Sequence, residues 1–330
     1  MISASDPLAW RPRIRREPDP RQGELKFAAR PHIFPVPMSK FTFPAGAVPA
    51  DLPERIRLQV LTPVTEPPDG KGWLHEIKHD GHRLVAIVAD GAVRLLSRNA
   101  RDRTELFAEP FRALAAAGLP AIVLDGEIAV PDDKGVTHID ALTEAMRMRR
   151  GEELAYFAFD LLYLDGHDLR ACAIEDRKAL LRDLVGAAGG PRLVTVDHVV
   201  GNGAALFEAV RQAGAEGIVS KRAGSPYRGG TGRDWLKTKV SEEGAFVITG
   251  YIERDAVAVA EMKNGVLVPV GMVKFGLAGK DLWQRLDALR IGPSTRSGLV
   301  RVRPELVAAV RYFGRYRTGW IRDGVPLSVG

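Results

Sequence analysis

The chain has 330 residues, of which 45% are hydrophobic and 27% charged, and its formal net charge is +6. This length is sufficient for two domains with ordinary buried cores. The sequence has no run of about 20 apolar residues, and its first residues lack an apolar signal core, so we expect a soluble cytoplasmic protein with no membrane partner. The single cysteine, Cys172, excludes an internal disulfide and a cysteine-based zinc site.

The positive charge is unevenly distributed. From Arg290 to the last residue, eight arginines stand against two acidic residues, a local balance of +6. Between Glu216 and Lys239, six basic residues stand against two acidic ones, a balance of +4. A polyanion such as a nucleic acid is the natural partner of such stretches. A solvated helix face would show the same pattern.

The N-terminal segment is rich in proline, with thirteen of the 22 prolines in residues 1–68. Proline fixes φ and lacks a backbone donor, so this segment cannot be regular helix or central strand throughout. We predict an extended arm over residues 1–57. Four arginines, 11, 13, 15 and 16, would let it grip DNA, and a tail without that contact is the alternative.

Short strands and helices follow the arm. A hairpin is predicted at 84–97 around an Asp-Gly turn. Helices are predicted from their start signals and strands from their β-rich composition. The predicted helices are 110–117, 175–187 and 203–213, and the further strands are 121–130, 154–164, 217–221 and 234–240. The mixture indicates an α+β domain over residues 58–241 with mainly antiparallel neighbours.

A second pattern begins at residue 242. Short strands are predicted at 245–252, 257–262 and 265–274, followed by a helix at 280–289 and a second short helix after Pro304. Several short strands with a helix in under 90 residues are typical of a small barrel of the oligonucleotide-binding type. We therefore predict a second domain over residues 242–330.

Strand periodicity places charged side chains on shared faces. In "VLDGEIA", Asp125 and Glu127 point to one side, and in "DWLKTKV", Trp235, Lys237 and Lys239 do the same. Two carboxylates that close require a cation, and two ammonium groups require a multiply charged anion. Strands with these faces opposed would form a nucleoside triphosphate site, although neither common phosphate-binding glycine loop occurs in the sequence.

Lys78 ends an apolar run and is the candidate nucleophile. Near lysines 221, 237 and 239, its amine would experience both desolvation and like charge, which favour the neutral, nucleophilic form. Its target would be the α-phosphorus of a nucleotide, with Mg²⁺ (or Mn²⁺) held by Glu127, Glu216 or Asp125. A hairpin with a solvated lysine is the structural alternative.

One site residue conflicts with simple strand parity. Glu216 and Lys221 are five residues apart and would face opposite ways on a regular strand. We therefore expect Glu216 to precede the strand or to lie at a bulge.

The stretch "KHDGHR", Lys78 to Arg83, resembles the K-x-D-G-x-R signature of the covalent nucleotidyltransferases, which comprise ATP-dependent DNA ligases, RNA ligases and capping enzymes. Further motifs of that family follow in order: "SRN" at 97–99, "LDGEI" at 124–128, "AFDLLYLDG" at 158–166, "EGIVSK" at 216–221 and "WLKTK" at 235–239. The resemblance runs from about Leu61 to the end. It is strongest to the ligase module of bacterial end-joining DNA ligases.

The resemblance implies an adenylation domain, an oligonucleotide-binding (OB-fold) barrel and a set of residue roles. Lys78 resembles the lysine that becomes adenylated, and Glu76 the residue that recognises adenine N6. Arg83 and Arg98 would bind the AMP phosphate or the 5′-phosphate at the nick. The remaining roles are ribose or metal contact for Glu127, stacking on adenine for Phe159, metal binding for Glu216, and triphosphate binding for Lys221, Lys237 and Lys239.

The resemblance also implies the activity: an ATP-dependent DNA ligase that passes through a lysyl-AMP and a DNA-adenylate. ATP and Mg²⁺ or Mn²⁺ would be its cofactors. Nicked or broken duplex DNA would be its substrate partner, and end-joining factors its protein partners. It would act as a monomer at the nucleoid in a bacterial cytoplasm. The last family motif, often R-x-D-K, is not matched in "GWIRDGVPLSVG", so we expect slow self-adenylation.

Three alternatives stay open on the sequence: an RNA ligase, a GTP-dependent capping-type enzyme, and a noncatalytic nucleic-acid-binding relic of the fold. Labelled ATP and GTP distinguish the enzymes. Convergence of Lys78, Glu127, Glu216 and Lys237 on one pocket would argue against a relic.

Overall fold

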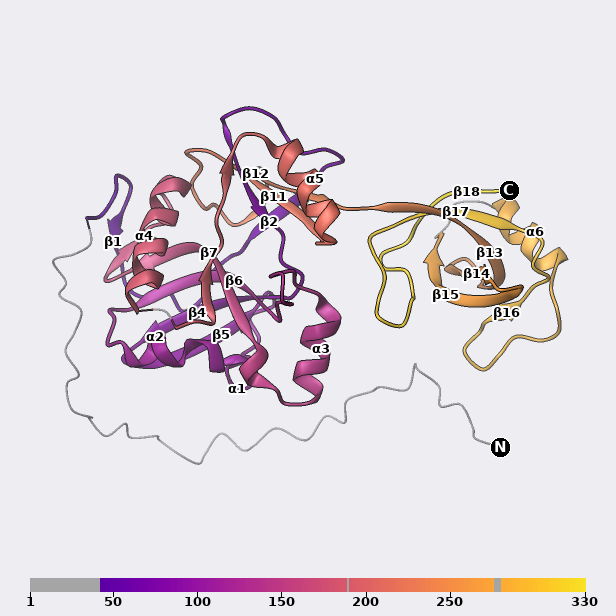
Figure 1. The fold of residues 1–330 in the computed structure, drawn as a ribbon, viewed down its shortest axis with the longest axis horizontal. Helices are drawn as coiled ribbons and strands as arrows, with labels where there is room; N and C mark the ends of the chain where they lie inside the picture. Colours follow the sequence, from indigo (N-terminus) through magenta and orange to yellow (C-terminus); the bar gives the residue numbers. More distant parts are fainter. Residues whose placement is uncertain (1–41, 189, 276–279) are drawn as a thin grey trace. The chain divides into compact units, whose positions relative to one another are not determined.

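The computed structural model describes residues 42–188, 190–275 and 280–330, shown in Figure 1. The four arginines with which the predicted arm would grip DNA, 11, 13, 15 and 16, lie outside these ranges. The described residues form three sheets with helices packed on them. Within these ranges, no helix combines the length and apolar character that a membrane crossing requires.

The first sheet has seven strands in the order β1-β8-β7-β6-β4-β5, with β9 added to β7. Only the β7–β9 pair is parallel among them. Alternate side chains of β4 enter two cores: Leu84, Ala86 and Val88 enter one, and Val85 and Ile87 the other. The strands are β1 (Val48–Pro49), β4 (His82–Ala89), β5 (Ala92–Ser97), β6 (Ile122–Ala129), β7 (Ala155–Leu164), β8 (His167–Asp168) and β9 (Leu193–Thr195).

Helices cover the first of these cores. Phe107, Phe111, Leu142 and Leu181 are buried there against the sheet. The predicted helices at 110–117 and 175–187 correspond to α2 and α4, whereas α3 was not predicted because it is short and only Leu142 and Ala145 are buried in it. The elements are α1 (Thr104–Phe107), η2 (Glu109–Phe111), α2 (Arg112–Ala116), α3 (Ile139–Arg147), η3 (Gly151–Glu153) and α4 (Ile174–Ala188).

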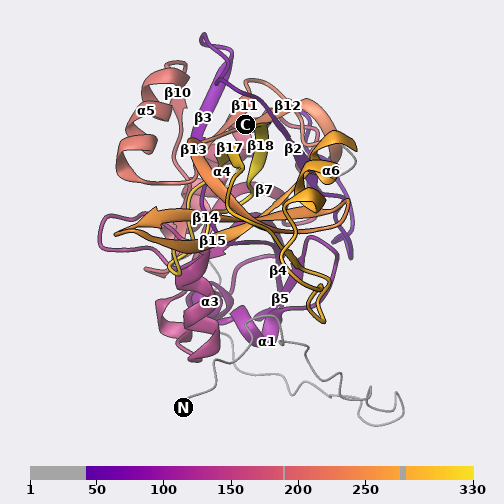
Figure 2. The ribbon, with the colours of Figure 1, turned by 90° about the vertical axis from the view of Figure 1, so that its right-hand side faces the viewer.

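The second sheet has the order β10-β3-β11-β12-β2, in which only β12 and β2 are parallel. Helix α5 (Gly203–Ala213) packs against β3, β10 and β11 (Figure 2). Leu74 and Trp235 of this sheet share a core with Val85 and Ile87 of the first, so the two sheets face each other. The strands are β2 (Gln59–Pro63), β3 (Trp73–Ile77), β10 (Val199–Val200), β11 (Gly217–Arg222) and β12 (Gly230–Lys239).

The segment just before β2 belongs to this part of the fold. Phe43 and Ala47 pack against the helix-covered core, and Leu52 and Ile56 against the core between the sheets. Part of the predicted arm, residues 43–56, therefore contributes side chains to these cores. Prolines prevent regular structure in this segment, but they leave an extended chain whose isolated apolar side chains still find buried sites.

The C-terminal residues form a third sheet with its own core. Its order is β15-β14-β13-β17-β18, with β16 on β13, and its core holds Phe246, Ile248, Val257 and Leu286. Gly330 closes the described chain. The elements are β13 (Glu242–Ile252), β14 (Ala256–Lys263), β15 (Val266–Lys274), α6 (Lys280–Ala288), β16 (Val300–Arg301), β17 (Val307–Tyr312) and β18 (Val325–Val329).

The short helix predicted after Pro304 is wrong, because this stretch is strand β17. Ala308, Val310 and Tyr312 are buried while the residues between them are more exposed. That period of two is the signature of a half-buried strand. Pairing with β13 over six residues overrides the helical preference of the alanines.

Candidate active site

A cavity lies between the first and second sheets. Its apolar and aromatic walls are Leu61, Ile77, Phe159, Val196, Val219 and Trp235. Its polar lining is Glu76, Lys78, His79, Arg83, Glu127 and Lys221. These residues come from seven strands and two loops. Six of them are site residues that the sequence predicted: Glu76, Lys78, Arg83, Glu127, Phe159 and Lys221.

Lys78 follows the last residue of β3, where its backbone N donates to Gly217 O at 2.9 Å. Its Nζ donates to Glu216 Oε2 at 2.5 Å, and Glu216 Oε1 lies 3.0 Å from Lys239 Nζ. Glu216 precedes β11, as its parity required. The lysine therefore faces a carboxylate shared with Lys239, rather than lysines alone as the sequence suggested.

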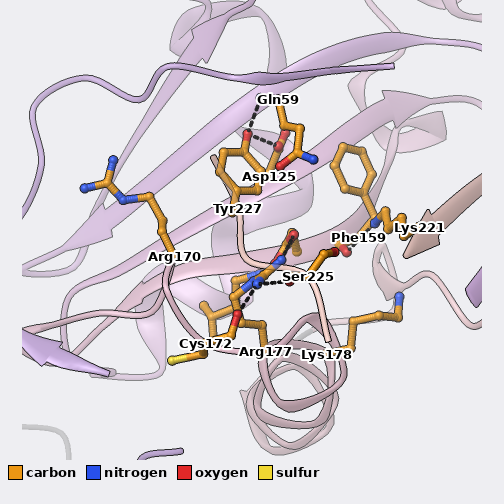
Figure 3. A network of polar contacts seen from close by, with 12 residues as sticks. Gln59, Asp125, Phe159, Arg170, Cys172, Arg177, Lys178, Lys221, Ser225 and Tyr227 are labelled. Atoms are coloured by element: carbon orange, nitrogen blue, oxygen red, sulfur yellow. Dashed lines mark hydrogen bonds and ion pairs between the residues drawn. The ribbon is translucent and has the colours of Figure 1, made fainter. Parts of the chain in front are cut away.

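Glu76 also lines the cavity and pairs with two buried lysines. Its Oε1 is 2.6 Å from Lys178 Nζ and its Oε2 is 2.8 Å from Lys221 Nζ. The glutamate is 2% exposed and each lysine 1%. Burial lowers the pKa of Lys221 to about 8, with Glu76 opposing the shift and Lys178 adding to it. Figure 3 shows Lys221 beside Phe159 and Lys178 on its helix.

The predicted triphosphate lysines occupy two places. Lys221 opposes Trp235 in the sheet and donates to Phe159 O at 3.0 Å, which puts it with Glu76. Lys237 and Lys239 share its face, as predicted, but lie further along β12 towards Glu216. Burial and then the charge of Lys239 lower the pKa of Lys237. Of these three lysines, Lys239 shares Glu216 with Lys78, and the charge of Lys78 acts on Lys237.

Arg98 is exposed and follows β5 in a turn. Its charge is among those that lower the pKa of Lys237. Arg98 is not among the residues that line the cavity between the sheets.

Aromatic rings form one wall of the cavity. Phe159 is half-buried, and its ring meets Trp235 edge to face with centroids 5.9 Å apart. Lys221 Nζ lies 4.2 Å from the Trp235 centroid and 4.7 Å from that of Phe159. Next to Lys78, the His79 ring stacks on Phe157 at 3.9 Å, and burial lowers its pKa to about 4.

Arg83 is held by Asp125 through two parallel hydrogen bonds. Its Nε is 2.9 Å from Asp125 Oδ1 and its Nη2 is 2.6 Å from Oδ2. Tyr227 Oη donates to Oδ2 at 2.7 Å and accepts from Gln59 N at 3.1 Å (Figure 3). Asp125 is fully buried. Asp125 therefore holds Arg83 and Tyr227 in place, and its role as a metal ligand stays a prediction.

Glu127 lines the cavity and lies in an unusual electrostatic environment. Burial raises its pKa to about 8, although the charges of Lys78 and Arg83 oppose the shift. No group of three His, Cys, Asp or Glu side chains within the described ranges is arranged to hold a metal. Mg²⁺ is commonly bound by one or two carboxylates together with substrate phosphates. The carboxylates of Glu127 and Glu216 are therefore chemically suitable as magnesium ligands.

Two buried cations of α4 were missed by the sequence analysis. Arg177 donates to Asp160, with Nε at 2.7 Å from Oδ1 and Nη2 at 2.9 Å from Oδ2, and Lys178 donates to Glu76. Both fall on the buried stripe of the helix, which also includes Ile174 and Leu181. A charged residue at such a position is a signal of a buried partner.

Comparison with known proteins gives a consistent set of likenesses. Residues 60–239 match the family described as ATP dependent DNA ligase domain. The chain is 34% identical over 328 residues to the multifunctional non-homologous end joining protein LigD of Pseudomonas aeruginosa, an alignment that covers 93% of this chain and 38% of that protein. The chain thus spans less than half the length of the curated relatives it matches first.

Solved structures show the same likeness in three dimensions. A structure of mycobacterial DNA ligase D complexed with ATP and MES is 32% identical, with a TM-score of 0.52, and the match covers 81% of this chain and 92% of that one. The ligase domain of LigD from M. tuberculosis is 31% identical, with a TM-score of 0.52 and coverage of 83% and 94%. The predicted α+β fold, a nucleotidyltransferase domain followed by an OB-fold, is confirmed.

Proposed function

Because the chain belongs to the family of ATP-dependent DNA ligase domains, we propose that it seals nicks or breaks in duplex DNA at the expense of ATP. The observation that carries this proposal is the position of Lys78. Lys78 lines a cavity that also contains the base end, formed by Glu76, Phe159 and Trp235, and it shares Glu216 with Lys239. A base would bind at the base end, and phosphates near Lys237 and Lys239.

The reaction would take place in three displacements at phosphorus. Lys78 Nζ attacks the α-phosphorus of ATP, a phosphoramidate bond forms and pyrophosphate leaves. A 5′-phosphate oxygen of the DNA then attacks the same phosphorus and releases the lysine, and finally the 3′-hydroxyl attacks the DNA phosphate and AMP leaves. Positioning and electrostatics supply most of the rate in such transfers.

The first step requires that the Lys78 ammonium lose a proton. Glu216 Oε2, at 2.5 Å from Nζ, is suitably located to accept it. Glu216 is itself paired with Lys239, so a triphosphate that draws Lys239 towards its own oxygens would free the carboxylate for this role.

The site residues would divide by location. Glu76 would accept from adenine N6, and Phe159 would stack on the base. Arg83, Arg98, Lys237 and Lys239 would bind phosphate oxygens. Lys221 would support Glu76 and the aromatic wall, since its contacts lie at that end.

Mg²⁺ is the proposed metal, with Glu127 and Glu216 as its protein ligands. When bound, it would neutralise charge on the phosphates. Glu127 would also contact the ribose.

We further propose that the two domains meet near residue 241 and that the protein acts as a monomer at the bacterial nucleoid in the cytoplasm. The separate hydrophobic clusters on either side of that residue support the boundary. The arginines of the C-terminal domain suit it to duplex DNA. End-joining factors are the proposed partners, by likeness to the end-joining relatives.

The test is covalent labelling with α-labelled nucleotide. We expect denatured wild-type protein to retain label from ATP and not from GTP, and Lys78→Ala to retain none. Label from GTP alone would indicate a capping-type enzyme. Nick sealing by Lys78→Ala at the wild-type rate would contradict the proposed nucleophile.

A further inference from the structure

Lys178 is a fully buried lysine that contacts the base end of the cavity from behind. Its Nζ donates to Glu76 Oε1 at 2.6 Å and to Val196 O at 2.7 Å. Both acceptors belong to residues that line the cavity. Lys178 itself comes from α4, which packs on β7 and β9. It therefore touches two parts of the cavity wall that are 120 residues apart in the sequence.

The pairing leaves an excess of positive charge around Glu76. One carboxylate meets two ammonium groups, because Lys221 holds the other oxygen at 2.8 Å. A lysine is among the residues least often buried, and one partner would be enough to balance Glu76. Folding alone therefore does not account for a second cation here.

We propose that Lys178 is a positioning residue that sets the preference of this site for adenine over guanine, an inference that rests on the proposed function. It does so by fixing Glu76 and the Val196 carbonyl as a rigid pair of hydrogen-bond acceptors. It does not touch the nucleotide.

The chemistry of the two bases supports this role. Adenine carries an amino group, a double donor, where guanine carries a carbonyl oxygen, an acceptor. The carboxylate of Glu76 offers acceptors, and each of its oxygens can accept more than one bond. The Val196 carbonyl also has a second lone pair. The pair thus matches the adenine amino group and repels the guanine oxygen.

Without Lys178, Glu76 and the Val196 carbonyl would no longer be fixed relative to each other. Glu76 Oε1 would be free to rotate away from the position in which Lys178 holds it. The Val196 carbonyl would lose its link to β3. Lys178 contacts Glu76 and Val196, whereas Lys78 contacts Glu216 and keeps that contact, so the chemical step at saturating nucleotide would change little.

The test compares Lys178→Met with Arg182→Met in the full chain. Methionine removes the charge and both donors while Glu76 keeps its pair with Lys221. Arg182 lies one turn further along α4, and its side chain is 56% exposed, so it is the matched control. The measurement is the rate of lysyl-nucleotide formation from α-labelled ATP and GTP over a range of concentrations with Mg²⁺.

We expect Lys178→Met to raise the KM for ATP and to reduce the ATP-to-GTP preference on the order of tenfold or more, the factor for one lost hydrogen bond to a charged group. The rate at saturating ATP should stay within about threefold of the wild-type rate; a tenfold change would correspond to about 1.4 kcal/mol. Arg182→Met should match the wild type. Lys178→Arg, which restores a cation and donors, should recover the preference.

An unchanged KM and an unchanged ATP-to-GTP preference in a folded Lys178→Met would overturn the inference. Should that variant fail to fold, Lys178→Leu also removes the charge and the donors, and wild-type selectivity in it would overturn the inference equally. If the wild type takes label from neither nucleotide, the proposed function itself fails. If the wild type is labelled and the Lys178 variants keep its preference for ATP, only the role of Lys178 fails.

Discussion

Replacing Asp125 with asparagine separates a structural role from metal binding. Asp125 is completely buried, and its two oxygens accept from Arg83 at 2.9 and 2.6 Å and from Tyr227 at 2.7 Å. Asparagine keeps the shape and removes the charge. Its amide nitrogen would then face a guanidinium donor instead of accepting from it.

The expected cost follows from these contacts. Arg83 would keep its charge, and its side chain is 17% exposed, so the substitution leaves a largely buried cation without its counter-ion. Breaking a buried pair in this way costs about 3–5 kcal/mol. For a domain of this size, that corresponds to a fall in Tm on the order of 10 °C.

The assay is urea unfolding followed by fluorescence, combined with the Mg²⁺ dependence of lysyl-adenylate formation. Asp168→Asn is the matched control, because Asp168 holds Arg170 through the same two-bond geometry but with side chains 20% and 38% exposed. It should cost no more than about 1 kcal/mol. We expect Asp125→Asn to lower the urea midpoint with an unchanged slope and an unchanged Mg²⁺ requirement. A loss below about 1 kcal/mol together with a raised Mg²⁺ requirement would refute the structural role.

Two further predictions concern stability. The pKa of His79 is lowered to about 4 by burial, so between about pH 6.5 and 4 the unfolded chain binds a proton that the folded chain does not, and stability falls as the pH falls through that window, by about 3 kcal/mol. His79→Phe, which keeps the stack on Phe157, should remove this part of the pH dependence in urea unfolding; equal slopes for both proteins would contradict the assignment. Gly126→Ala should destabilise the protein by about 1–3 kcal/mol or more, because its Cβ would meet the Tyr156 ring and lie 2.7 Å from Phe157 O. Gly232→Ala, with no atom within 4 Å of the added Cβ, should change the unfolding midpoint little, and similar shifts in both variants would show that crowding at Gly126 is not the cause.

Much of the fold followed from local patterns. The alternation in β6 predicted one face for Asp125 and Glu127, and in the structure Asp125 holds Arg83 while Glu127 lines the cavity beside Arg83. The parity of Glu216 and Lys221 indicated that Glu216 precedes its strand, as it does. These predictions succeed because the direction of a side chain depends on its own strand.

Local patterns did not reveal the charge that each side chain would meet. Asp125 and Glu127 share a face of β6, yet Asp125 is held by Arg83 and Tyr227 while Glu127 lines the cavity. Glu76 is paired with Lys178, which is 102 residues away in the sequence. The sequence by itself determined most of the elements, the order of the motifs and the nucleophile candidate. Only the tertiary structure decided the ion pairs, because a buried charge takes the partner that long-range packing brings within hydrogen-bonding distance, and no local periodicity encodes that distance.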